Sequence, residues 1–121
     1  MATQKVGEIA PNVAAALGRP ELANAPIYLG DSNVAHMQAR HPADFLKYGA
    51  DIPTILASPD YVGQNPKDNS IEYVKEYVLN GEFVKVAVRV SSTGKHFARS
   101  LYILGNNRVN NFVAKGTLKK P

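Results

Sequence analysis

Residues 71–104 read IEYVKEYVLNGEFVKVAVRVSSTGKHFARSLYIL, and this stretch decides the fold. Apolar and polar residues alternate along three runs, 71–78, 82–91 and 96–104, with the period of a half-buried β-strand. Asn80-Gly81 separates the first two runs and Thr93-Gly94 the last two, and both dipeptides favour tight turns. The stretch therefore predicts three antiparallel strands joined by hairpins.

Segments with helical spacing precede these strands, at residues 33–40, 42–49 and 52–57. Ser32 and Asp51 are the expected caps, and Pro42 suits a first helical position. Short strands are expected at 27–29 and 61–62, and the basic tail is expected to add a helical turn or an edge strand. This order predicts an α+β fold in which N-terminal helices pack on one face of a roughly four-stranded antiparallel sheet.

The chain has 121 residues, enough for one hydrophobic core. Residues 1–26 are rich in Ala, Pro and Asn, and the prolines interrupt any helical pattern beyond a short helix near Val13–Leu17. We therefore expect residues 1–26 to be an N-terminal arm or linker, and residues 27–121 to form a single domain.

The composition excludes several classes of protein. Without cysteine the chain forms no disulfide, thiolate nucleophile or cysteine-based zinc site. No apolar run approaches the roughly 18 residues of a membrane-spanning helix, and the start, MATQKVGEIAP, does not resemble a secretory signal peptide. We expect no membrane partner and no signal peptide. The net charge of +4 favours an anionic partner such as nucleic acid.

Two-residue turns at Asn80-Gly81 and Thr93-Gly94 would fix the register of both hairpins and would pair Glu72 with Arg89. One sheet face then consists mainly of valines and lies under the helices. The other, the polar face, carries Glu72, Glu76, Lys85, Arg89, Ser91, His96, Ser100 and Tyr102. Arg99 does not fit, because the register places it among the valines. A bulge, an exit from the sheet edge or a wrong register would each explain it.

The polar face has two interpretations. Antiparallel sheets commonly leave one face in solvent, where Glu–Lys and Glu–Arg pairs stabilise neighbouring strands. The same set also supplies what RNA cleavage without a metal requires: a base, an acid and cations that stabilise the phosphorane. Glu72 or a histidine would be the base and a histidine the acid. Arg89 with Lys85 would clamp the phosphate, and Ser100 with Tyr102 would orient it. No cofactor or metal is expected.

The three histidines and one loop lysine each have a structural and a functional interpretation. His36 lies off the apolar stripe of its helix, so it is either solvated or catalytic. His41 lies on that stripe, so it is either a hydrogen-bonded junction residue or an acid–base group. His96 lies beside the second turn, either exposed or substrate-binding. Lys67 belongs to the turn-rich segment QNPKDNS, from which it could reach a phosphate.

Four segments, in order along the chain, carry a family resemblance: IYLGDSNVAHMQARHPADFLKYGADIPTIL, SPDYVGQNPKDNSIEYVKEY, VKVAVRVSSTGKHFARSLYIL and VAKGTLKKP. They resemble the phage-type nuclease domains of the barnase–EndoU–colicin–RelA (BECR) superfamily. The resemblance covers about residues 27–121 and implies a barnase-like domain there, with the active site on the open face of a four-stranded antiparallel sheet. It also implies metal-independent ribonuclease activity, and several members of that superfamily attack tRNA.

The resemblance further implies a site that combines a helix histidine with basic and hydroxyl residues of the sheet. His36 or His41 matches the histidine, and the sheet residues are Arg89, Ser91, Arg99 and Ser100. The implied substrate is RNA, with tRNA as one candidate. The implied place of action is the bacterial cytoplasm, for a nuclease that is phage-encoded or delivered as a toxin. An immunity or inhibitor protein would be a second partner, which the sequence leaves open.

Two other functions stay open on the same fold. One is an RNA- or nucleotide-binding module without catalysis. The other is a phage structural or interaction domain whose polar face docks a protein partner. An assay with RNA would distinguish the three functions. Cleavage would indicate the nuclease, binding without cleavage the binding module, and neither result the interaction domain.

Overall fold

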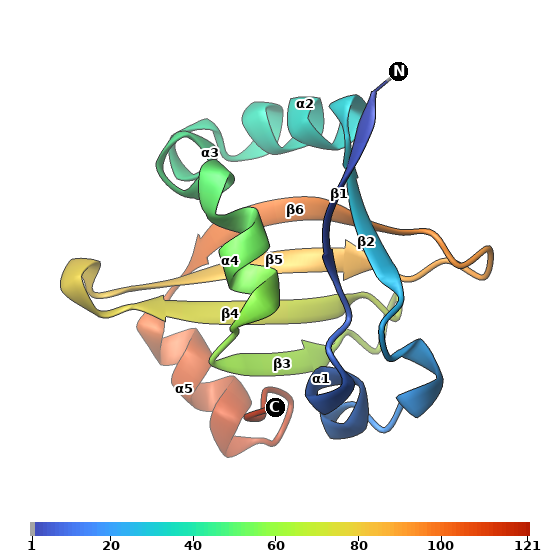
Figure 1. Cartoon of the computed structure of the whole chain (residues 1–121). Coiled ribbons are helices and arrows are strands. Elements are labelled where there is room, and N and C mark those ends of the chain that lie inside the picture. Colours follow the sequence, from blue (N-terminus) through green and yellow to red (C-terminus); the bar gives the residue numbers. More distant parts are fainter. Residues whose placement is uncertain (1) are drawn as a thin grey trace.

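The computed structural model describes residues 2–121, which form five α-helices and one six-stranded sheet (Figure 1). The strands are β1 (Thr3–Glu8), β2 (Pro26–Gly30), β3 (Tyr61–Gln64), β4 (Ile71–Tyr77), β5 (Glu82–Arg89) and β6 (His96–Leu104). The helices are α1 (Pro11–Ala16), α2 (Asp31–Arg40), α3 (Pro42–Tyr48), α4 (Ile52–Ala57) and α5 (Asn106–Ala114). None of the helices within residues 2–121 has the length and apolar character that a membrane crossing requires.

The strand order in the sheet is β1-β2-β6-β5-β4-β3. Strands β3 to β6 form an antiparallel unit, but β2 runs parallel to β6 over two residue pairs and β1 adds an antiparallel edge. The α+β class is confirmed, whereas the expected four-stranded, purely antiparallel sheet is wrong. The parallel contact is too short to leave a pattern in the sequence, because it involves only Ile27–Tyr28 and His96–Phe97.

The N-terminal segment expected to be an arm or linker is part of the fold. β1 pairs with β2 along its length, and Val6, Ile9 and Val13 are buried in the same core as the central strands. Pro11 and Pro20 lie at the starts of α1 and of a 3₁₀ turn at Pro20–Leu22, where a missing N–H costs no hydrogen bond, and Pro26 is the first residue of β2. The expected boundary after residue 26 is therefore corrected, and the fold begins at β1.

The two faces of the antiparallel unit are covered differently. Val84, Val86 and Val88 of β5 are fully buried on the face that contacts α4, which crosses in front of β4 and β5 in Figure 1. On the opposite face, α5 and the tail cover one end of the sheet, where Val74 packs with Leu104, Val109 and Leu118. Within residues 2–121, the other end of this second face is left open and forms cavities. This uncovered part carries the polar residues.

The β4–β5 hairpin differs from its predicted register. Val78–Asn80 form a 3₁₀ turn and Gly81 takes a left-handed φ of 64°, so Tyr77 rather than Leu79 pairs with Glu82. Glu72 consequently faces Ala87 instead of Arg89. A shift of two residues keeps every side chain on its face, so the polar face survives this error.

The β5–β6 hairpin contains the bulge that explains Arg99. The predicted pairs Lys85–Tyr102 and Ala87–Ser100 are present, but a register shift between Ala87 and Val88 then pairs Val88 with Ala98 and Arg89 with Phe97. Arg99 is the extra residue, and it leaves the valine face for the polar face. The shift also exchanges the faces of the residues before it, so Phe97 joins the polar face and His96 becomes buried.

Gly63 of β3 leaves no room for a side chain, because a Cβ there would lie 2.3 Å from the Thr117 carbonyl oxygen. Two hydrogen bonds between Val62 and Lys119 fix the tail in this position. We expect Gly63→Ala to lower the free energy of unfolding by about 1–3 kcal/mol through overpacking, as measured by urea denaturation. At Gly7 a Cβ would make only ordinary contact with Leu56, so Gly7→Ala is the control. Equal losses in the two variants would contradict the steric explanation.

Candidate active site

Two adjoining cavities open on the polar face beside α2. The large cavity, of about 490 Å³, is lined by Ser32, Asn33, His36, Arg89, Phe97 and Arg99, among others. The small cavity, of about 210 Å³, is lined by residues including His36, Asp68, Glu72, Lys85, Arg99, Ser100 and Tyr102. His36 and Arg99 line both, so they form the boundary between the two. We refer to the two cavities together as the cleft.

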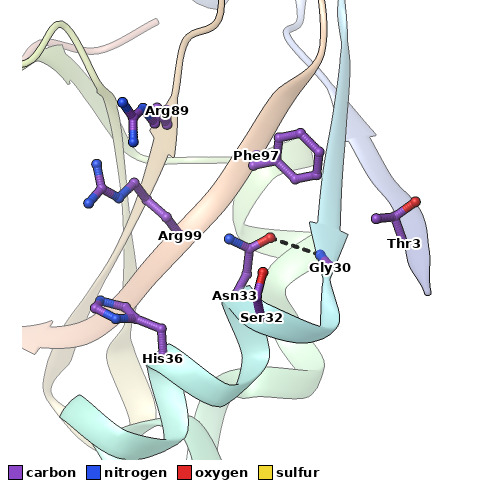
Figure 2. Close-up of a pocket in the computed structure, with 8 residues that line it drawn as sticks. All are labelled: Thr3, Gly30, Ser32, Asn33, His36, Arg89, Phe97 and Arg99. Carbon is purple, nitrogen blue, oxygen red and sulfur yellow. Dashed lines mark hydrogen bonds between the residues drawn. The ribbon is translucent and has the colours of Figure 1, made fainter. Parts of the chain in front are cut away.

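Helix α2 carries His36 to this boundary. The helix follows β2 directly, and its start is fixed by the Gly30 N–H, which donates to Asn33 Oδ1 at 2.9 Å (Figure 2). Asn33 thus takes the role expected of Ser32. Met37 is fully buried and anchors the helix to the core, whereas the adjacent His36 is exposed and reaches the cleft. The position of His36 is therefore set by the Asn33 hydrogen bond at the start of α2 and by the buried Met37.

Arg89 and Arg99 come from adjacent strands and lie on the same side of the sheet (Figure 2). Among the residues that the structure describes, neither arginine forms an ion pair. The nearby Asp68 accepts a hydrogen bond from the Ser70 N–H, which lowers the pKa of Asp68, and the charge of Arg99 lowers it further. Two guanidinium groups without ion-pair partners make this part of the cleft suited to an anion.

Glu72 and Lys85 form an ion pair on the floor of the small cavity. Glu72 Oε2 lies 2.5 Å from Lys85 Nζ, and the two side chains are only 13% and 12% exposed. Burial lowers the pKa of Lys85, but the hydrogen bond and charge of Glu72, together with Tyr102, outweigh burial and raise it overall. Lys85 therefore stays cationic within the cleft.

Tyr102 connects the small cavity to the second helix histidine. Its ring stacks on that of His41 with centroids 4.9 Å apart, and Lys85 Nζ lies 5.1 Å from the ring centroid of Tyr102. Asp44 Oδ2 accepts a hydrogen bond from the Ile103 N–H at 3.0 Å, which ties α3 to β6. His41 thus packs against the Tyr102 ring and does not itself line either cavity.

The structure brings seven of the expected site residues to the cleft: His36, Glu72, Lys85, Arg89, Arg99, Ser100 and Tyr102. It leaves out three that were expected to bind substrate. His96 is 2% exposed, and its Nδ1 accepts a hydrogen bond from the Ser91 N–H at 3.0 Å. Ser91 belongs to the hairpin turn, where its hydroxyl contacts that of Thr93. Lys67 is exposed on its loop and lines neither cavity.

Sequence reasoning missed Asn33, Phe97 and Asp68. The misfit of Arg99 was a signal for Phe97, because one bulged residue reverses the face of the residue two positions earlier. Asn33 and Asp68 gave no such signal. Asn33 lies at the start of a helix and Asp68 in a loop, and only tertiary packing brings these two segments to the cleft. Across residues 2–121, no group of three or more His, Asp or Glu side chains is placed to hold a metal ion.

The burial of His96 makes stability depend on pH. Burial lowers the pKa of His96, and its Nδ1 is already occupied as an acceptor, so the folded state binds a proton less readily than the unfolded chain. The stabilisation is complete above the unfolded pKa of about 6.5 and is lost as the pH falls below it, by at most about 1.4 kcal/mol per pH unit. We expect His96→Asn, which keeps an acceptor, to unfold with a shallower acid slope in denaturation experiments. Identical slopes in the wild type and in His96→Asn would contradict the prediction.

The cleft joins a helix histidine, a Glu–Lys pair and two arginines that form no ion pair within the described residues, and such groups can bind a phosphate and transfer protons. A family model described as phage-Barnase-EndoU-ColicinE5/D-RelE like nuclease3 matches residues 4–111, and the chain belongs to this family. The match confirms the resemblance and starts within β1, ahead of the segment that suggested it. Comparisons with curated proteins and with solved structures gave no match. The family assigns the chain a nuclease domain, which acts on nucleic acid.

Proposed function

We propose that the chain is an endoribonuclease that cleaves RNA by attack of a 2′-OH on the adjacent phosphate, without a metal ion. The observation that carries the proposal is the shared boundary of the two cavities. His36 and Arg99 line both cavities there, and the Glu72–Lys85 pair lies in the small cavity. A base, an acid and a cationic clamp are the groups that this reaction needs.

Glu72 and His36 move the protons in the proposed reaction. Glu72 takes the proton of the 2′-OH while the 2′-oxygen forms a bond to phosphorus. The bond from phosphorus to the 5′-oxygen breaks, and the imidazolium of His36 protonates that oxygen. The products are a 2′,3′-cyclic phosphate and a free 5′-OH, so atoms and charge balance without a co-reactant.

The cations of the cleft stabilise the phosphorane that forms between these steps. Arg99 and Arg89 offer planar guanidinium donors to the nonbridging oxygens, and Lys85 adds a charge that its pairing with Glu72 preserves. Ser100 and Tyr102 supply hydroxyl groups that orient the phosphate. A positive chain of net charge +4 also favours the approach of RNA.

The test is incubation of the purified protein with tRNA and with unstructured RNA in the presence of EDTA. We expect fragments that end in 2′,3′-cyclic phosphate, and no cleavage of an oligonucleotide whose 2′-OH groups are replaced by hydrogen. Intact RNA would contradict the proposal. A salt-dependent mobility shift without cleavage would favour an RNA-binding module, and the absence of both would favour an interaction domain.

The proposal includes tRNA as a candidate substrate and the bacterial cytoplasm as the place of action, for a phage-encoded or toxin nuclease. An immunity or inhibitor protein would then need an acidic surface that covers the cleft, because Arg89 and Arg99 lack ion-pair partners among the described residues.

A further inference from the structure

The large cavity contains an aromatic side chain that the proposed chemistry does not use. Phe97 is half-buried on β6 and lines the cavity opposite the start of α2, where Ser32 and Asn33 lie (Figure 2). The volume of about 490 Å³ falls within the roughly 300–1,000 Å³ of small-molecule sites. His36 and Arg99 separate this cavity from the small one, so a group bound here would adjoin the phosphate.

The polar groups of the large cavity can read the edge of a planar ligand. Asn33 Oδ1 accepts the Gly30 N–H, and within residues 2–121 its Nδ2 group has no hydrogen-bond partner. Arg89 pairs with Phe97 across the two strands, and both side chains line the large cavity. A ring, a cation and a side-chain amide are the groups with which proteins stack and recognise unpaired bases.

An aromatic and cationic surface continues away from the cleft. The ring centroid of Tyr28 lies 6.0 Å from that of Phe97, and Lys95 Nζ lies 6.0 Å from the Tyr28 ring centroid. Surfaces that bind single-stranded nucleic acid alternate aromatic rings and cations in this way, because each base stacks while each phosphate is neutralised.

We propose that the large cavity binds one nucleobase next to the scissile phosphate, stacked on Phe97 and read at its edge by Asn33. This inference rests on the proposed function and adds a substrate class to it: RNA that is single-stranded at the cleavage site. A paired base is held in its helix and cannot enter the cavity, so loops and unpaired ends are cleaved and duplexes are spared.

The first test is a double-mutant cycle between Phe97 and the base. The substrates are oligodeoxynucleotides with a single ribonucleotide, either intact or with a stable abasic residue on one side of the cleavable phosphate. We expect the wild-type kcat/KM to fall about tenfold or more for an abasic residue on one side only. Phe97→Ala should cause the same loss on the intact substrate and little further loss on the abasic one. If Phe97→Ala lowers both rates by the same factor, the ring does not contact the base and the inference is overturned.

Phe112→Ala is the matched control, since Phe112 is also half-buried but packs in the α5 cluster. It should leave the ratio of the two rates unchanged, and thermal unfolding shows whether each variant folds. If the wild type cleaves nothing, the proposed function fails, and the base site is then tested alone. The same cycle is measured as Kd for uncleavable 2′-O-methyl RNA, with and without the abasic residue.

The second test separates recognition of the base edge from stacking. Asn33→Asp keeps the oxygen that caps α2 but removes the Nδ2 donor. Rates are measured on four substrates that differ only in the base beside the cleaved phosphate, so the added negative charge affects all four alike. We expect the ratios among the four rates to change by severalfold. A uniform change in all four would exclude Asn33 from base recognition.

Discussion

Arg99→Ala is expected to reduce kcat/KM for RNA cleavage by about 100- to 1,000-fold, the usual effect of removing one preorganised donor from a phosphoryl or acyl transition state. Arg99 lines both cavities and forms no ion pair among the described residues, so its guanidinium can donate directly to a phosphate; the nearby Asp68 acts on it only through its charge. Arg99→Lys should recover only part of the activity, because a lysine cannot present two parallel donors to a phosphate. Initial rates on a defined oligonucleotide measure both variants.

The matched control for Arg99 is Arg108→Ala, which removes an exposed arginine from α5. Its activity should stay close to wild type. If Arg108→Ala lost as much activity as Arg99→Ala, net charge rather than position would explain the effect. Thermal unfolding of Arg99→Ala should change little, since a bulged residue makes no ladder contact that the alanine lacks.

His36→Ala is expected to reduce kcat by about 100- to 10,000-fold, the contribution typical of a general acid. His36 lies at the boundary of the two cavities, whereas His41 lines neither and stacks on Tyr102. His41→Ala should therefore cost less than tenfold, through a less firmly held Tyr102. Single-turnover rates isolate this chemical step from binding.

A leaving group that needs no proton provides the decisive control for His36. With a 4-nitrophenyl ester in place of the 5′-nucleoside, His36→Ala should retain most of the wild-type rate, because 4-nitrophenolate departs without protonation. An equal loss on both substrates would mean that His36 orients the phosphate or acts as the base. A larger loss for His41→Ala than for His36→Ala would reverse the assignment of the two histidines.

The strands and helices of the central fold followed from local patterns, but the features that complete the site did not. Alternation identified the three long strands, and a register error of two residues on β4 was harmless because it preserved the faces. The bulge was different, since a shift of one residue changed the faces of Phe97 and His96. In the sequence, the only indication of that shift was the expected position of Arg99 among the valines.

The choice between the two histidines also lay beyond the sequence. The expected apolar stripe continued from Met37 to His41 only if one helix included both. In the structure α2 ends at Arg40, and His41 has a φ of −141°, so it belongs to a junction. Likewise β1 was hidden in an Ala- and Pro-rich segment, because its partner β2 is more than 15 residues away and edge pairing leaves no local signature.

Because of the bulge at Arg99, the number of residues in β6, rather than their type, decides which side chains enter the core and which line the cleft. Before the bulge the inward side chains of β6 are the even-numbered His96 and Ala98. After the bulge the inward side chain is the odd-numbered Leu101, because the bulge adds one residue between them. A single-residue deletion or insertion there would turn Phe97 into the core and His96 out of it without altering either residue. A relative of this chain that kept every site residue but changed the number of residues in this hairpin would have the same side chains in its sequence. It would lack the sheet face on which these side chains meet.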